Sequence, residues 1–192
     1  MHQQEVYLIR HGETEWSVNG RHTGLTDLPL TSNGRRIART LRHALARENF
    51  ALVLTSPLQR ARETCELAGF ADRAQVDRDL MEWNYGSYEG LTTTEIRALV
   101  PGWLLFRDGC PGGEKPDQVG ARVDRLISHV RNVAGNVALF AHGHLFRVFA
   151  ARWIGLPVSA GSNFLLDTAT LNILGYYREI PAVHRWNAML TG

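Results

Sequence analysis

Val6-Tyr7-Leu8-Ile9-Arg10-His11-Gly12 is the stretch that decides the fold of this chain, because an apolar strand runs directly into a His-Gly pair. A second stretch of the same kind, Val137-Ala138-Leu139-Phe140-Ala141, runs into His142-Gly143. In open α/β sheets, ligands bind at the carboxyl ends of the strands. We therefore expect the imidazoles of His11 and His142 to meet at one site.

Around these two strands, segments of strand and helix type alternate along the chain. The pattern predicts strands at residues 6–10, 51–55, 75–77, 137–141, 169–177 and 182–186. It predicts one helix that begins within residues 30–34 and another that begins at Pro57, with Ser56 as its N-cap. Further helices are predicted at residues 94–100, 119–130 and 145–154. Residues 12–31 and 101–113 are expected to be irregular. The alternation indicates a three-layer α/β/α fold with a mostly parallel central sheet, in a single domain spanning residues 1–192.

The composition excludes several classes of protein. Hydrophobic residues make up 44% and charged residues 21% of the chain, which is typical of a globular protein. The formal net charge of +2 is too small for nucleic-acid binding by charge alone. Cys65 and Cys110 form neither a disulfide framework nor a metal-binding spacing, and no apolar run has the length of a signal peptide or a membrane span. We expect a cytoplasmic protein that binds neither nucleic acid nor membrane.

Arginine and histidine side chains gather at the predicted strand ends. Arg10 and His11 follow the first strand, Arg60 lies in the first turn of the helix after the second, and His142 follows a later strand. Guanidinium groups match phosphate oxygens in pairs, and a helix N-terminus favours an anion. An imidazole held beside that phosphate can attack phosphorus. A carboxylic acid is then needed to protonate the leaving alkoxide, and Glu13, Glu82 and Glu89 are candidates that the residues alone do not rank.

Arg10-His11-Gly12-Glu13-Thr14-Glu15-Trp16 resembles the signature of the histidine phosphatase superfamily, which has the phosphoglycerate-mutase-like fold. The resemblance continues through residues 24–31, 55–61, 80–90 and 141–143, in the family's order over nearly the whole chain. It implies that His11 is the nucleophile and forms a phosphohistidine, while Arg10 and Arg60 clamp the phosphate. It further implies that His142 donates a hydrogen bond to the phosphoryl group and that Glu82 is the proton donor. No metal ion and no other cofactor is implied, because the arginines neutralise the charge.

Within the superfamily, the chain most resembles the sedoheptulose-1,7-bisphosphatase branch. The segments that carry this resemblance are Trp16-Ser17, residues 22–31, 82–90 and 111–114, and His144. Ser17 departs from the asparagine that mutases and many relatives carry after the tryptophan. The resemblance implies a metal-independent phosphatase with sedoheptulose 1,7-bisphosphate and fructose 1,6-bisphosphate as preferred substrates. The alternatives are a phosphoglycerate mutase, a protein-phosphohistidine phosphatase, and a phospholigand-binding protein without turnover.

Several residues near these motifs have two interpretations. Ser17, Thr23 and Gly143 are predicted to contact the phosphate, and the alternative for Ser17 and Thr23 is an ordinary loop role. The aromatic residues either wall the substrate pocket or pack in the core; they are Trp83, Tyr85, Tyr88, Trp103 and Phe106. His22 lies in a loop that would border the pocket. The apolar helix at 145–154 is either buried in the fold or shared with a second subunit, so a homo-oligomer stays open. The expected partner is a small phosphorylated metabolite.

Overall fold

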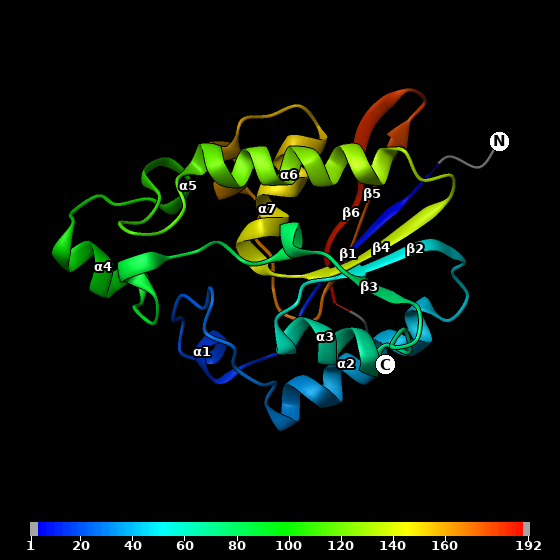
Figure 1. Cartoon of the computed structure of the whole chain (residues 1–192), viewed down its shortest axis with the longest axis horizontal. Helices are drawn as coiled ribbons and strands as arrows, with labels where there is room; N and C mark the ends of the chain where they lie inside the picture. The colour runs from blue at the N-terminus through cyan, green and yellow to red at the C-terminus, as the bar shows by residue number, and fades with distance from the viewer. Residues whose placement is uncertain (1–3, 190–192) are drawn as a thin grey trace.

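A six-stranded sheet forms the middle layer of the computed structural model, which describes residues 4–189 (Figure 1). The strand order is β3-β2-β4-β1-β5-β6, and β3, β2, β4 and β1 run parallel while β5 is antiparallel to both of its neighbours. The strands are β1 (Val6–Arg10), β2 (Phe50–Thr55), β3 (Ala74–Val76), β4 (Asn136–Ala141), β5 (Leu171–Tyr177) and β6 (Ile180–Ala188). The expected mostly parallel central sheet is confirmed.

Helices cover both faces of this sheet (Figure 1). They are α1 (Glu15–Val18), α2 (Ser32–Leu45), α3 (Gln59–Leu67), α4 (Thr93–Leu99), α5 (Leu105–Asp108), α6 (Pro116–Arg131) and α7 (Gly143–Trp153). Short 3-10 helices lie at Arg78–Leu80, Gly86–Tyr88 and Val158–Asn163. In Figure 1, α2 and α3 lie below the sheet and α6 lies above it together with α7. The three-layer prediction is therefore confirmed.

The alternation of side chains along β1 explains why both faces need a cover. Val6 and Leu8 pack into the core on the side of α6 and α7, whereas Tyr7 and Ile9 pack into the core on the side of α2. Successive side chains of a strand point to opposite faces, so a continuous apolar strand must be buried on both. Helix α7 is buried within the chain itself, since Leu145, Phe146, Val148, Phe149 and Ala150 are all 0% exposed.

The pairing of β1 with β4 brings the two His-Gly pairs side by side. Arg10 lies opposite Ala141 in the parallel register, and the backbone N–H of His11 donates to the Ala141 carbonyl at 2.9 Å. Both strands therefore end at the same edge of the sheet, and His11 and His142 follow at the same level. This is the arrangement that the sequence predicts.

Three local predictions are corrected by the structure. Ser56 is not the N-cap of α3, because the helix begins two residues after Pro57, at Gln59, with Leu58 at the N-cap position. The loop at 12–31 contains the short helix α1, which is closed by a capping box between Thr14 and Ser17. The irregular segment at 101–113 contains α5. In the part of the chain that the structure describes, none of the helices combines the length and the apolar character needed to cross a membrane.

Candidate active site

His11 stands at the carboxyl end of β1 and is 5% exposed. Its Nδ1 lies 2.7 Å from the Gly12 carbonyl oxygen, which can only accept, so Nδ1 carries the ring proton and donates. The lone pair of the neutral ring is then on Nε2. Burial, followed by the charges of Arg60 and Arg10, holds the pKa of His11 well below its usual value of 6.5. His11 is therefore a neutral imidazole with Nε2 available as a nucleophile.

His142 meets His11 as the sequence predicts. The two ring centroids are 5.2 Å apart, and His142 is fully buried. The Nε2 of His142 lies 2.8 Å from the hydroxyl of Ser56, the residue that the sequence predicted as the N-cap of α3. The Ser56 hydroxyl therefore orients His142, and it also accepts a 3.3 Å hydrogen bond from the Leu58 N–H. Burial, followed by the positive charge of Arg60, lowers the pKa of His142 well below its usual value.

Both predicted arginines lie at this site, and backbone carbonyls hold them. Arg60 is fully buried in the first turn of α3 and donates to the carbonyls of Thr23 at 3.0 Å, Gly24 at 2.9 Å and Thr26 at 3.0 Å. The Nη1 of Arg10 donates to the carbonyl of Leu166. These hydrogen bonds hold the two guanidinium groups in place and leave their positive charge without a carboxylate to neutralise it.

Three buried nitrogens at the site have no hydrogen-bond partner. Across residues 4–189, they are the only buried side-chain nitrogen or oxygen atoms in this condition: Arg10 Nε, Arg60 Nε and His142 Nδ1. Buried polar groups are nearly always paired, so a cluster of exceptions requires an explanation. All three belong to the residues whose charges or rings act on His11. An anion with several acceptor oxygens would satisfy the two guanidinium donors.

Of the three candidate acids, only Glu82 lines the cavity beside His11. Its Oε1 accepts from the N–H groups of Trp83 and Leu145 at 2.9 Å each, and its Oε2 accepts from the N–H of His144 at 3.0 Å. Glu13 instead binds the side chains of Thr31 and Asn33 at the start of α2. Glu89 accepts hydrogen bonds from the backbone N–H groups of Gly24 and Thr26, and so it supports the loop whose carbonyls hold Arg60.

The cavity itself has a volume of about 260 Å³. Six of the predicted site residues line it: Arg10, His11, Ser17, Thr23, Glu82 and Gly143. Arg60 and His142 are fully buried and contact the cavity-lining loops from within the protein. The Ser17 hydroxyl is engaged in the α1 capping box, donating to the Thr14 carbonyl at 2.8 Å, and the Thr23 hydroxyl donates to the Arg21 carbonyl at 3.2 Å.

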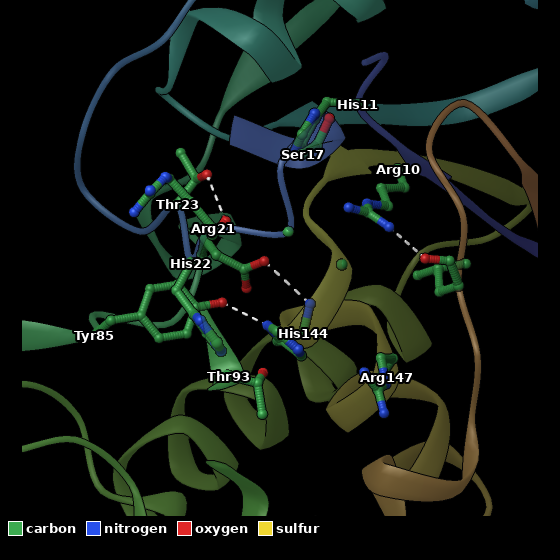
Figure 2. A pocket seen from close by; sticks show the side chains of 14 residues that line it. Arg10, His11, Ser17, Arg21, His22, Thr23, Tyr85, Thr93, His144 and Arg147 are labelled. Carbon is green, nitrogen blue, oxygen red and sulfur yellow. Dashed lines mark hydrogen bonds between the residues drawn. The ribbon is translucent and has the colours of Figure 1, made fainter. Parts of the chain in front are cut away.

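Only part of a second wall of the cavity was predicted from the sequence: His22 as a residue bordering the pocket and Tyr85 in one of two interpretations, while His144 was noted only for its resemblance to one branch of the family. This wall consists of Gly20, Arg21, His22, Tyr85, Thr93, His144, Arg147 and Leu166 (Figure 2). His144 and Arg147 lie three residues apart on α7, and this helical spacing after a His-Gly pair is the signal that could have identified them. Among the aromatic residues, Tyr85 lines the cavity, while Trp83, Tyr88, Trp103 and Phe106 pack in the core.

Comparisons with known proteins agree with this geometry. A model of the histidine phosphatase superfamily (branch 1) matches residues 6–189. The chain is 41% identical over 175 residues to a Mycobacterium tuberculosis protein named acid phosphatase, covering 89% of this chain and 86% of that protein. It is 40% identical over 183 residues to the sedoheptulose 1,7-bisphosphatase of Saccharomyces cerevisiae, covering 79% of this chain and 68% of the yeast protein.

Solved structures show the same fold. The structure of an open reading frame from Mycobacterium tuberculosis superposes with a TM-score of 0.93 at 37% identity, over 98% of this chain and 99% of that chain. A mycobacterial glucosyl-3-phosphoglycerate phosphatase superposes with a TM-score of 0.85 at 27% identity, over 97% of this chain and 100% of the other. The fold is therefore shared over nearly all of this chain.

Proposed function

The chain belongs to the histidine phosphatase superfamily and, with its phosphatase-named relatives, is a phosphoric monoester hydrolase, and we propose that it hydrolyses sugar phosphates through a phosphohistidine on His11. Sedoheptulose 1,7-bisphosphate and fructose 1,6-bisphosphate are the proposed preferred substrates. The observation that carries the proposal is the cluster of three unpartnered buried nitrogens on Arg10, Arg60 and His142 around a neutral His11. A transferring phosphoryl group supplies the acceptor oxygens that the guanidinium donors require.

In the first proposed step, the Nε2 lone pair of His11 forms a bond to phosphorus while the bond from phosphorus to the sugar oxygen breaks. A proton carried by the Glu82 carboxyl passes to that oxygen, so the sugar leaves as an alcohol. In the second step, water attacks phosphorus and gives its proton back to Glu82. The bond from phosphorus to nitrogen breaks, and its electron pair returns to His11 as inorganic phosphate leaves.

Metal independence is part of the proposal, and the arginines support it. Preorganised positive groups stabilise a phosphoryl transition state by electrostatics, the role that Mg²⁺ has in kinases. Arg10 and Arg60 are fixed by backbone carbonyls before substrate arrives. A unit charge pair at 4 Å contributes roughly 4 kcal/mol at an effective dielectric constant of about 20.

The preference for a bisphosphate is supported by the second wall of the cavity. Arg21 and Arg147 line that wall, in addition to Arg10 next to His11 (Figure 2). Arg21 is paired with Glu95 at 3.4 Å, so Arg147 is the arginine of this wall that has no ion pair among residues 4–189. Arg147 is held by the carbonyls of Gly161 at 3.0 Å and Ser162 at 3.1 Å, and its guanidinium lies 4.6 Å from the centre of the Phe106 ring. A second anionic group on the substrate would contact positive charge there. The similarity to a yeast sedoheptulose 1,7-bisphosphatase points the same way.

The test is phosphate release from a panel of sugar monophosphates, sugar bisphosphates and 3-phosphoglycerate in excess EDTA. We expect release led by the bisphosphates, and we expect His11→Ala to lower it by at least about 10³-fold while His43→Ala, on the exposed side of α2, leaves it unchanged. Labelled substrate should leave acid-labile phosphate on the wild-type chain but not on His11→Ala. Retained activity in His11→Ala would exclude the covalent mechanism. Interconversion of phosphoglycerates without phosphate release would instead identify a mutase.

A further inference from the structure

Two histidines of the second wall, His22 and His144, form a stacked pair that the phosphoryl chemistry does not use. Their ring centroids are 5.7 Å apart with an interplanar angle of 12°. Aromatic rings hold both in place: Trp103 contacts His22 at 5.6 Å, Phe106 contacts His144 at 5.5 Å, and Tyr85 contacts both. Figure 2 shows Tyr85, His22 and His144 together along one side of the cavity.

The Tyr85 hydroxyl fixes the tautomer of His144. Tyr85 is 1% exposed, and its hydroxyl lies 2.5 Å from His144 Nδ1, which is its one hydrogen-bond partner among residues 4–189. The phenol has no other acceptor among residues 4–189, which favours donation to His144, and burial raises the pKa of Tyr85 well above its usual value, so the proton stays on the oxygen. Nδ1 of His144 therefore accepts. In a neutral imidazole, the remaining proton is then on Nε2, which becomes a donor.

The opposite tautomer is fixed on His22. Its Nδ1 lies 2.8 Å from the Leu91 carbonyl oxygen, so Nδ1 carries the proton and Nε2 carries the lone pair. Burial is the main cause that lowers the pKa of both histidines, and the neighbouring Arg147 adds to it for His144. Both rings are thus neutral, one with a donor nitrogen and the other with an acceptor nitrogen, and both belong to cavity-lining residues.

We propose that His22 and His144 form a hydroxyl-recognition site for the organic part of the substrate, with His144 Nε2–H donating to a hydroxyl oxygen and His22 Nε2 accepting a hydroxyl proton. A hydroxyl group both donates and accepts, so a donor nitrogen next to an acceptor nitrogen matches it, whereas a phosphate offers acceptors alone at neutral pH. Tyr85 is a positioning residue that keeps the proton on His144 Nε2. The inference rests on the proposed function and adds that the substrate carries hydroxyl groups close to the transferred phosphate.

The test compares sorbitol 6-phosphate with hexyl phosphate, two open-chain six-carbon esters that differ in their hydroxyl groups. The readout is the ratio of their kcat/KM values, with phenyl phosphate as a measure of the phosphoryl chemistry itself. In the wild type we expect a ratio of about tenfold or more, since a site with buried polar groups rejects a ligand that leaves them unpaired. His144→Leu should bring the ratio close to one, while His144→Gln, which keeps an N–H donor near the Nε2 position, should retain most of it.

Tyr85→Phe removes the phenol oxygen and keeps the ring, so it tests the positioning role. We expect the ratio to fall while phenyl phosphate hydrolysis changes much less. Nitrogen NMR of the histidine side chains gives a readout that packing alone would not move: in the wild type, His144 should show a protonated Nε2 and an unprotonated Nδ1, and in Tyr85→Phe it should show a mixture of tautomers.

The outcomes separate the two proposals. If the wild type hydrolyses neither these esters nor the two sugar bisphosphates, the proposed function fails, and the tautomer measurement still decides the assignment at His144. If it hydrolyses bisphosphates alone, the ratio is measured with fructose 1,6-bisphosphate against hexane-1,6-diol bisphosphate instead. If the esters are hydrolysed but His144→Leu keeps the wild-type ratio, the hydroxyl-recognition site is refuted while the phosphatase reaction stands. A protonated Nδ1 on His144 in the wild type would refute the role assigned to Tyr85.

Discussion

Glu82→Gln is the substitution that tests the proposed proton donor and its hydrogen bonds together. The carboxylate accepts three backbone N–H groups, two on Oε1 and one on Oε2. A glutamine keeps one oxygen, which we expect to stay on the N–H groups of Trp83 and Leu145. Its amide NH₂ then faces the N–H of His144, and two donors cannot pair. The substitution therefore removes one hydrogen bond to the carboxylate of the free protein, and it also removes the group that would carry the proton during the reaction.

The two losses have separate magnitudes. A hydrogen bond to a charged group contributes about 1.5–3 kcal/mol to the free energy of unfolding, which is a fall in Tm of roughly 3–12 °C for a chain of this size. Loss of a general acid lowers the rate by about 10²–10⁴-fold when the leaving group is a poor one. A sugar alkoxide needs that proton, whereas p-nitrophenolate is stable without it. We therefore expect a large loss of kcat on sugar phosphates and a small loss on p-nitrophenyl phosphate.

The assay measures kcat and KM of wild type and Glu82→Gln on both substrates, with thermal unfolding of the same samples. Glu13→Gln is the matched control, because Glu13 binds Thr31 and Asn33 away from the cavity. It should preserve the ratio of the two activities. An equal loss on both substrates in Glu82→Gln would refute the assignment of Glu82 as the acid. An unchanged Tm would refute the account of its three hydrogen bonds.

Three further predictions follow from local geometry. In Gly143→Ala, the added Cβ would lie 3.1 Å from Arg10 Nε, so we expect the guanidinium to move and kcat/KM to fall by about tenfold, with unfolding by urea nearly unchanged. Burial lowers the pKa values of His11 and His142 in the folded chain, so the unfolded chain binds more protons than the folded chain below pH 6.5. The free energy of unfolding should therefore be fully retained above pH 6.5 and should fall below it, by up to about 1.4 kcal/mol per pH unit for each histidine. Urea titrations at several pH values measure this. Ala169 has φ +54°, so Ala169→Gly should raise the free energy of unfolding by up to about 1 kcal/mol, whereas Ala38→Gly inside α2 should lower it by about as much.

Sequence reasoning succeeds where a local pattern carries the information. The strands β1, β2 and β4 can be recognised in the sequence as apolar runs. The carboxyl ends of β1 and β4 determine where Arg10, His11 and His142 meet. Arg60 follows from the same logic, since it lies in the first turn of the helix that follows β2. These residues depend on the chain direction and on strand position alone. For that reason the deep part of the site can be predicted without coordinates.

The second wall depends on contacts between distant segments, and these leave little trace in the local sequence. His22 is placed by backbone pairing with Leu91, with hydrogen bonds from His22 N to Leu91 O and from Gly90 N to His22 O at 2.9 Å each. Glu82 could not be separated from Glu13 by sequence position, because both follow signature residues closely. What distinguishes them is the start of α7, whose N–H groups hold Glu82 alone. The predicted N-cap of α3 was wrong for a similar reason, because the Ser56 hydroxyl forms a hydrogen bond with His142, 86 residues away in the sequence.

The partners of Arg10 and Arg60 indicate how the proposed phosphate site can be built before a substrate arrives. Among residues 4–189, six arginines pair with carboxylates, and Arg122 does so with Glu114 at 2.9 Å. Within residues 4–189, Arg10 and Arg60 have no such ion pair and are held by backbone carbonyls. A carboxylate partner would cancel the charge that the phosphate needs, whereas a carbonyl orients the guanidinium and leaves its full charge in place. Burial of such a charge is unfavourable for folding, so the same feature that prepares the site for phosphate also makes it a place where the free protein is less stable than it could be.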